Sequence, residues 1–358
     1  MITAIDLTSV SDNLSGLERM AVCLSYEMVR LRPDITFVIV IKNSLPEPLK
    51  RFRKFDNVKF ARVKGGKLAV NQIKLPFAMA GINADAYIFP AFPVPLLFGK
   101  KKGRRIYGTV ADTAVFDVPD TMKLRSRLLF GAGLKHTAKV CDSVITISEF
   151  SKSRIKKNLP YVKDITLAYC AVDEINAAPS KRDVRKKYGL PEKYLLALST
   201  VEPRKNAAFL SRGYEAYRKA GGELPLVFAG RNGWLTDTEK LDNLIFSGFI
   251  DDEDLASVYA GAEAFLDASV YEGFGMPPLE ALKCGVKKLF VSDIPAHREV
   301  LLDAAEYFDK DDENAFAQGL IIYLDEPVTD KRLDAIERRL KAFSWKESAE
   351  RILDAVTV

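Results

Sequence analysis

Two glutamates, Glu272 and Glu280, flank a segment rich in glycine and proline in this chain of 358 residues. Proline is tolerated in a first helical turn and Gly285 is a natural stop, so a short helix is predicted from about Pro277 to Cys284. Glu280 would then lie in the first turn, beside free N–H groups that attract a phosphate. Glu272 precedes the turn and could accept hydrogen bonds from the hydroxyls of a ribose or sugar. The alternative is a tight glycine turn whose two glutamates only favour the helix dipole.

A second candidate segment, Ser199 to Asn206, follows an apolar stretch that ends at Leu198 and contains Arg204 and Lys205. Basic residues at a helix start oppose the helix dipole, so their placement there favours an anionic ligand. A guanidinium and an ammonium side by side could neutralise a diphosphate leaving group. The alternative is a pair of solvated surface cations.

A third segment, Thr8 to Leu17, is a loop of serine, asparagine and glycine, with Ser15 and Gly16 opening a predicted helix toward Leu31. It resembles a phosphate-cradling turn, but it matches neither the G-x-G-x-x-G nor the P-loop pattern. Helix capping explains it equally well.

The elements that would position these segments alternate between short apolar strands and amphipathic helices, which is typical of parallel sheets with crossover helices. In such folds ligands bind at the carboxyl ends of the strands, so the loops after strands are the candidate sites. A linker is predicted from Ala168 to Ser180, after a short strand at Ile165 to Leu167. The other predicted strands are Ile2 to Leu7, Ile35 to Ile41, Ala86 to Phe89, Arg105 to Val110, Val144 to Ile147, Tyr194 to Leu198, Leu226 to Ala229, Ala264 to Leu266 and Lys288 to Val291.

The composition is that of a globular protein, with 48% hydrophobic and 28% charged residues. A chain of 358 residues is long enough for two cores, so two domains are expected. The 4 cysteines lie far apart without a C-x-x-C pair, which favours a reduced, cytoplasmic protein. Met1 to Leu7 read as a strand without a signal-peptide pattern, and no apolar run approaches the length of a membrane-spanning helix.

The net charge of +5 is unevenly distributed, because residues 1–175 have 28 basic against 16 acidic residues and the remainder has 25 against 32. A basic first half suits an anionic partner. The apolar stretch Pro93 to Phe98, followed by Lys100 to Lys102, Arg104 and Arg105, could dock on anionic lipid. It could equally be a buried connection between strands with a charged end. Nucleic acid ranks last as a partner, because no recognised module or aromatic-basic signature is present.

Nearly the whole chain resembles the retaining glycosyltransferases of family 4, which have two facing Rossmann-like domains in the α/β arrangement called GT-B. The family's E-x7-E signature corresponds to Glu272 and Glu280, within YEGFGMPPLEALKCG. Its basic diphosphate-binding segment corresponds to EPRKN, and its N-terminal glycine loop to SGLER at Ser15 to Arg19. Further similar segments are VITISEFSKSRI at Val144 to Ile155 and the closing helix FSWKESAERIL at Phe343 to Leu353.

The resemblance implies an acceptor domain over residues 1–170, a nucleotide-sugar donor domain over 171–342, and a C-terminal helix over 343–358 that packs back toward the first domain. It implies that Glu280 holds the ribose and that Glu272 and the backbone of residues 274–276 hold the donor sugar. Arg204 and Lys205 would take the diphosphate, the backbone near Ile250 would meet the base, and Gly16 would let the first domain close over the phosphates. The implied catalytic residues are Glu272, Arg204 and Lys205, and the implied donor-binding residues are Gly16, Arg204, Lys205, Ile250, Glu272, Phe274, Gly275, Met276 and Glu280.

Such enzymes usually need no metal, and no metal cofactor is expected here. Asp252 to Asp254 spell the D-x-D of metal-using glycosyltransferases, but they open an apparent helix from Asp251 to Tyr259, where acidic residues are ordinary dipole partners. The sequence differs from the family pattern at Ala111, which occupies the position of the family's histidine near the donor sugar. The chain's two histidines, His136 and His297, are interpreted as packing residues.

The expected activity is transfer of a hexose, with retention, from a nucleotide diphosphate donor such as a UDP- or GDP-sugar. The expected acceptor is a glycan or a lipid-linked glycan in surface polysaccharide assembly. The expected location is the cytoplasm, at the inner face of the membrane. The alternative, supported by Ala111, is a non-catalytic GT-B subunit that binds a sugar nucleotide or supports a partner enzyme.

Overall fold

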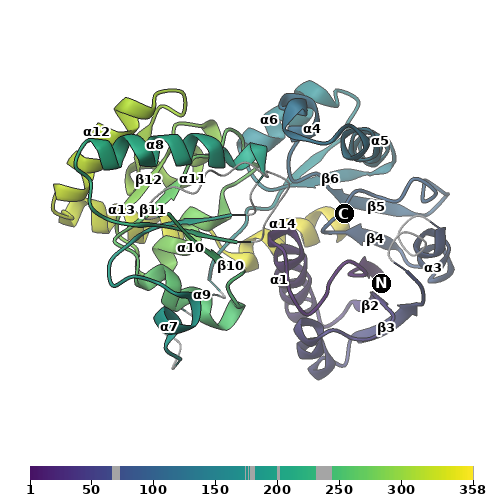
Figure 1. Ribbon diagram of the computed structural model, residues 1–358. Helices are drawn as coiled ribbons and strands as arrows, with labels where there is room; N and C mark the ends of the chain where they lie inside the picture. The colour runs from purple at the N-terminus through teal and green to yellow at the C-terminus, as the bar shows by residue number, and fades with distance from the viewer. Residues whose placement is uncertain are drawn as a thin grey trace. The chain divides into compact units, whose positions relative to one another are not determined.

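A computed structural model describes residues 1–66, 73–173, 175, 177, 182–199, 202–230 and 244–357. The chain divides into two compact units (Figure 1). Unit 1 comprises Met1–Pro119, Lys123–Ala171 and Ser344–Val358, and unit 2 comprises Asp120–Met122 and Val172–Phe343. The division at Ala171 falls within the predicted linker, of which residues 174, 176 and 178–180 lie outside the described part of the chain.

Unit 1 contains a sheet of seven parallel strands in the order β3-β2-β1-β4-β5-β6-β7. Its central strands are buried on both faces, as expected where crossover helices cover a parallel sheet. The strands are β1 (Ile2–Asp6), β2 (Thr36–Lys42), β3 (Val58–Val63), β4 (Ala86–Phe89), β5 (Arg105–Thr109), β6 (Ser143–Thr146) and β7 (Ile165–Leu167). The helices are α1 (Gly16–Leu31), η1 (Glu47–Lys54), α3 (Leu75–Gly81), α4 (Ala114–Asp117), η3 (Pro119–Thr121, with its last two residues in unit 2), α5 (Leu124–Val140), α6 (Glu149–Asn158) and α14 (Trp345–Thr357).

Unit 2 contains a sheet of six parallel strands in the order β10-β9-β8-β11-β12-β13. The strands are β8 (Leu195–Leu198), β9 (Leu226–Ala229), β10 (Leu244–Gly248), β11 (Ala264–Asp267), β12 (Leu289–Ser292) and β13 (Glu306–Phe308). The helices are α7 (Val184–Tyr188), η4 (Pro203–Lys205), α8 (Ala207–Lys219), α9 (Asp252–Ala260), α10 (Met276–Lys283), α11 (Pro295–Leu301), η5 (Leu302–Ala304), α12 (Glu313–Asp325) and α13 (Asp330–Lys341).

An aromatic cluster fills the core of unit 2 on one face of its sheet. Phe290 of β12 and Phe308 of β13 lie 4.9 Å apart between ring centroids, and Phe316 of α12 meets Phe308 edge-on at 4.8 Å. Phe209 of α8 stacks on Phe308 at 5.8 Å. Large buried rings of this kind supply much of the apolar area that folding removes from water, so α8 and α12 are fixed on the sheet and the loops at its carboxyl edge have a rigid base.

All ten strands predicted from the sequence are present, with ends that differ by at most one residue. Three further strands, β3, β10 and β13, were not predicted. Each of them lies at an edge of its sheet, where the apolar signal is weaker.

The last helix, α14, belongs to unit 1 although it follows unit 2 in the chain. It packs against α1 and β7, and the hydroxyl of Tyr107 donates to the carbonyl of Ala355 at 2.8 Å. The hydroxyl of Ser348 donates to the carbonyl of Tyr169, also at 2.8 Å. The C-terminal segment is therefore part of the unit 1 core.

Replacing Ile352 tests this role of α14, because Ile352 is fully buried on that helix. Ile352→Ala is expected to lower the free energy of unfolding of unit 1 by about 2–5 kcal/mol, the usual cost of such a cavity. Asp354→Ala, at an exposed position of the same helix, is the control and should change it by less than about 0.5 kcal/mol. Denaturant unfolding followed by circular dichroism measures both, and equal effects of the two variants would contradict the assignment.

Candidate functional site

The glycine-rich segment follows β11 and leads into α10. Gly275 has a φ of +90°, which only glycine adopts without strain, and α10 begins directly after it at Met276. A Cβ at Gly275 would lie 3.1 Å from Cδ2 of His297, so close packing also requires glycine here.

Glu280 is not in the first turn of its helix, so this prediction was wrong. The helix starts at Met276, because the left-handed conformation of Gly275 sets its beginning, and no acidic residue lies in its first turn. Glu280 is half-buried just beyond that first turn, where its Oε2 accepts a hydrogen bond from the hydroxyl of Tyr259 at 3.2 Å. Burial and the negative charge of Glu280 raise the pKa of Tyr259 well above its usual value, so the phenol stays a neutral donor.

Glu272 forms a buried ion pair with the second predicted segment. Nζ of Lys205 lies 2.6 Å from Oε1 of Glu272, and Nη1 of Arg204 lies 3.4 Å from Oε2. The backbone N–H of Val270 also donates to the carbonyl of Arg204 at 2.9 Å, which joins the two loops. The structure therefore brings together three residues that the sequence analysis assigned to one site.

Burial and charge act in opposite directions on this cluster. Burial alone would raise the pKa of Glu272, but the positive charges of Lys205 and Arg204 lower it to about 2. Burial alone would lower the pKa of Lys205, but the negative charges of Glu272 and Asp267 raise it above its usual value. All three side chains are therefore charged at neutral pH, and both cations pair with the carboxylate of Glu272.

Arg204 and Lys205 were expected at the start of a helix, but they lie before α8, which begins at Ala207. They form the 3-10 turn η4, and Asn206, with a φ of +52°, separates this turn from α8. The helix-dipole argument for an anionic ligand therefore does not apply to them, and their pairing with Glu272 replaces it. Residues 200 and 201 of this segment lie outside the described part of the chain.

His297 is a residue that the sequence analysis did not place in the site. It is fully buried on α11, its Nδ1 lies 2.9 Å from the carbonyl oxygen of Ser292, and its Nε2 lies 3.8 Å from Oδ2 of Asp267. The feature of the sequence that could have identified His297 is its position just after β12, which is the neighbour of β11 in the sheet. His136, by contrast, contacts the carbonyl of Phe98 at 2.8 Å, in agreement with a packing role.

Of the remaining predicted donor-site residues, Phe274 and Met276 flank Gly275 in the glycine-rich turn, Ile250 follows β10, and Gly16 lies in unit 1. Phe274 is buried and packs edge-on against Phe343 at 5.1 Å, and Ile250 is buried after β10. Gly16 is the first residue of α1, where the N–H of Ser15 donates to the Glu18 carboxylate at 2.8 Å. Capping thus accounts for this loop, and a Cβ at Gly16 would meet nothing within 4 Å.

The acidic run at the start of α9 has a local structural role. Asp252, Glu253 and Asp254 occupy its first turn, and the fully buried Asp254 accepts hydrogen bonds from Lys187 at 2.6 Å and Tyr188 at 2.9 Å. These bonds fasten α7 to α9. Within the described ranges, no group of three His, Cys, Asp or Glu side chains is arranged to hold a metal ion.

Ala111 lies in unit 1 between β5, which ends at Thr109, and α4, which begins at Ala114. The carboxylate of Asp112 accepts a hydrogen bond from the N–H of Ala114 at 2.9 Å, which stabilises the start of that helix. Ala111 itself is half-buried and has only a methyl group to offer a ligand.

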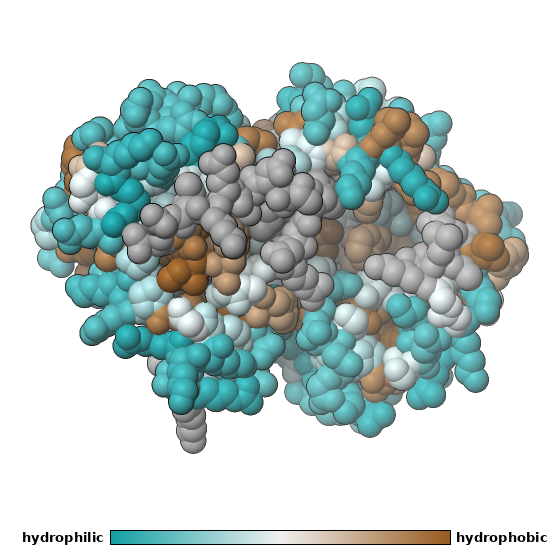
Figure 2. Space-filling model, viewed as in Figure 1, coloured by the Kyte–Doolittle hydropathy of each residue, from teal (hydrophilic) through white to brown (hydrophobic). Residues whose placement is uncertain are grey.

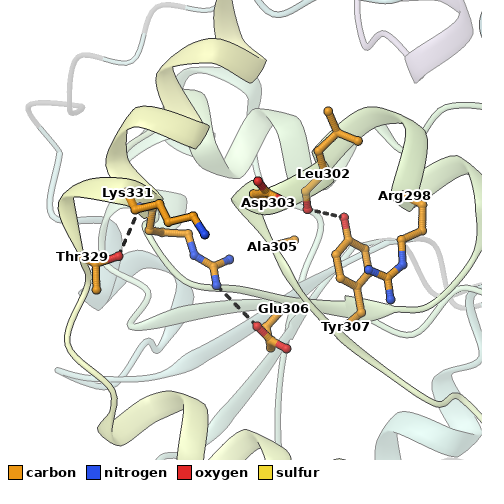
Figure 3. Close-up of a pocket in the computed structure, with 9 residues that line it drawn as sticks. Arg298, Leu302, Asp303, Ala305, Glu306, Tyr307, Thr329 and Lys331 are labelled. Atoms are coloured by element: carbon orange, nitrogen blue, oxygen red, sulfur yellow. Dashed lines mark hydrogen bonds and ion pairs between the residues drawn. The ribbon is translucent and has the colours of Figure 1, made fainter.

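A polar pocket of about 310 Å³ lies elsewhere on unit 2, between η5, β13 and the start of α13 (Figure 3). Arg332 reaches Glu306 at 3.4 Å across it, and the hydroxyl of Tyr307 donates to the carbonyl of Leu302 at 2.7 Å. None of the predicted site residues lines this pocket.

Comparison with known proteins identifies the class. Residues 180–341 match the family model described as "Glycosyl transferases group 1". The chain is 30% identical to the O-antigen chain mannosyltransferase B of Escherichia coli over 268 residues, covering 70% of each chain. It is 27% identical to the O-antigen chain mannosyltransferase RfbU of Salmonella typhimurium over 220 residues, covering 59% of each.

Solved structures give the fold. Sucrose-phosphate synthase from Thermosynechococcus elongatus superposes with a TM-score of 0.72 at 16% identity, covering 99% of this chain and 98% of that one. Anabaena HepE, in complex with UDP and glucose, superposes with a TM-score of 0.72 at 12% identity, covering 100% and 99%. The chain has the GT-B fold of two Rossmann-like units, and this prediction is confirmed.

The chain is thus a glycosyltransferase. It belongs to the glycosyl transferases group 1 family.

Removing one partner of the Lys205–Glu272 pair is expected to leave an uncompensated buried charge. Glu272→Gln and Lys205→Met should each lower the free energy of unfolding of unit 2 by about 3–5 kcal/mol, and the double variant should cost no more than either single one. Asp293→Asn is the control, because it breaks an exposed pair with Arg298 and should cost at most about 1 kcal/mol. Urea unfolding measures all four, and additive single effects would show that the two charges do not interact.

Proposed function

We propose that this glycosyltransferase transfers a hexose from a nucleotide diphosphate sugar, with retention, to a glycan or lipid-linked acceptor in surface polysaccharide assembly. The observation that carries the proposal is the cluster of Glu272, Lys205 and Arg204 beside the left-handed turn at Gly275. Two of the relatives are O-antigen chain mannosyltransferases, which supports mannose as the first hexose to test. HepE was solved with UDP and glucose, which supports a nucleotide-sugar donor.

In the proposed mechanism Arg204 and Lys205 stabilise the negative charge that builds on the diphosphate as the sugar leaves. Glu272, ionised because its pKa is about 2, accepts hydrogen bonds from the sugar hydroxyls and holds both cations in position. Glu280 holds the ribose diol with one oxygen while Tyr259 fixes the other. An oxygen of the departing diphosphate accepts the proton of the acceptor hydroxyl.

The backbone of residues 274–276 is proposed to contact the donor sugar, because Gly275 leaves no side chain between the turn and a ligand. Ile250 would present its backbone to the base, and Gly16 of unit 1 would approach the phosphates without a side chain in the way. In this assignment unit 2 is the donor unit and unit 1 the acceptor unit. No metal is assigned a role.

A cytoplasmic location at an anionic membrane surface is part of the proposal. The basic first half of the sequence supports it. Across the described residues, no helix is both long enough and apolar enough to cross a bilayer. A lipid-linked acceptor would suit such a location.

The second candidate function is a non-catalytic subunit that binds a sugar nucleotide. The observation in its favour is Ala111, whose methyl group cannot form a hydrogen bond with a donor sugar. Both candidate functions would use the ion-paired cluster around Glu272, so only a measurement of sugar transfer can distinguish the enzyme from the non-catalytic subunit.

Glu280→Gln tests the donor site. A thermal-shift panel of UDP, GDP, ADP and their sugars first selects the donor, and release of the nucleotide diphosphate is then measured with glycan and lipid-linked acceptors. Weakening the contact with the ribose should lower kcat/KM about 10–100-fold. Glu263→Gln, at an exposed position of unit 2, should leave it unchanged. Donor binding without turnover on any acceptor would favour the non-catalytic subunit.

The anomeric proton of the product tests the stereochemistry. With an α-linked sugar nucleotide as donor, the new glycosidic bond should give the NMR coupling of an α-linkage in the first product formed. A β-linked product would contradict the retaining mechanism while leaving the transferase assignment in place.

A further inference from the structure

Helix α5 of unit 1 places large apolar side chains in solvent. Leu124, Leu128 and Leu129 are 65%, 64% and 61% exposed, and Phe130 is 42% exposed. The helix is held to the unit by a different face, with Leu134 and Ala138 among its buried residues. In Figure 2, brown apolar residues reach the surface of unit 1 in the region where Figure 1 labels α5. An exposed apolar group of this size marks an interaction surface.

The exposed residues follow the outward face of the helix. Leu124, Leu128 and Ala132 are spaced by four residues and therefore lie one above the other, all of them exposed. Lys135 and Lys139 continue the same face toward the end of the helix and are also exposed. One face thus joins an apolar half to a cationic half.

The charge of α5 has a single sign. Its sequence contains Arg125, Arg127, Lys135 and Lys139 but no Asp or Glu. Lys135 and Lys139 lie 5.7 Å from the ring centroids of Phe116 and Tyr161, and none of the four cations forms an ion pair with a carboxylate of the described residues. The two arginines stand near the helix N-terminus, where positive charge opposes the helix dipole. An anionic partner would compensate for both features.

A second group of exposed apolar side chains lies beside α5, in the connection between β4 and β5. Leu96 and Leu97 are 47% and 66% exposed, whereas Val94 and Phe98 are buried, so only part of the apolar stretch predicted as a lipid contact reaches the surface. The N–H of Val94 donates to the hydroxyl of Thr137 on α5 at 2.8 Å. This bond, with the His136 contact to Phe98, holds the loop against the helix.

The cations after this loop divide into two sets. Lys100 is paired with Asp142 at 2.6 Å, and Arg104 lies over the ring of Phe98 at 4.5 Å, so both have structural partners. Lys101 and Lys102 are exposed. They add positive charge next to Leu96 and Leu97.

We propose that the outward face of α5 and the Leu96–Leu97 loop together form a surface that docks on an anionic lipid bilayer. Leucines that enter the acyl boundary while lysines and arginines contact headgroups match the chemistry of an interfacial helix. A nucleic acid would leave the leucines in water, and a protein interface of this composition would need a complementary acidic rim. The proposal extends the membrane-surface part of the proposed function.

Co-sedimentation with vesicles tests the docking surface without any sugar nucleotide, so its failure would leave the transferase proposal untouched. With phosphatidylcholine vesicles that contain 30% phosphatidylglycerol, the fraction of the full chain that pellets should be about tenfold larger than with phosphatidylcholine vesicles alone. Added salt should reduce this binding. Leu128→Glu with Leu129→Glu should abolish it, and Arg125→Gln with Arg127→Gln should weaken it.

The matched control is Ile322→Glu, which changes an isoleucine that is 59% exposed on α12 of unit 2. It should bind the anionic vesicles like the wild-type chain. Circular dichroism and turnover of a water-soluble acceptor verify that each variant is folded. Absence of vesicle binding by the wild-type chain, or equal binding by the Leu128/Leu129 variant, would overturn the proposal. A dimer in sedimentation equilibrium that this variant dissociates, without vesicle binding, would instead assign the face to a second copy of the chain.

Discussion

The site of unit 2 depends on the buried ion pair between Lys205 and Glu272. Desolvating a single charge costs several kcal/mol, so neither side chain could remain charged in this largely buried position without the other. The pair therefore fixes the loop after β8 against the loop after β11. A site that has to stabilise a new negative charge gains most from cations that are already oriented, because no reorganisation is then needed during the reaction. Stability alone would be served as well by an apolar contact.

The parallel sheet brings the two loops together. β8, β11 and β12 are neighbours in the sheet and run in the same direction, so their carboxyl ends lie along one edge. Lys205 follows β8, Glu272 follows β11 and His297 follows β12, although they are far apart in sequence. Gly275 completes the arrangement, because its positive φ turns the chain into α10 while its missing Cβ leaves room for His297. The geometry thus follows from topology plus one backbone conformation.

The sequence was sufficient for the fold class and for naming Arg204, Lys205 and Glu272, but neither their contacts nor the position of His297 beside them was predicted from it. Buried strands such as β4 are short apolar runs that stand out, whereas the edge strands β3, β10 and β13 are only partly apolar and were missed. The ion pair between Lys205 and Glu272 joins loops 67 positions apart, and nothing local in either loop specifies it. Glu280 lies just beyond the first turn rather than within it, because α10 begins at Met276, one residue before the predicted start at Pro277.

The ion pair also limits what Glu272 can do in the proposed reaction. A carboxylate whose pKa is held at about 2 is a very weak base, so it is poorly suited to take a proton from an acceptor hydroxyl at neutral pH. It remains a strong hydrogen-bond acceptor for sugar hydroxyls. The proton must therefore go to another group, and the departing diphosphate gains basicity as its bond to the sugar breaks. In this view Lys205 and Arg204 activate the leaving group directly, and they also keep Glu272 from competing with it for the proton.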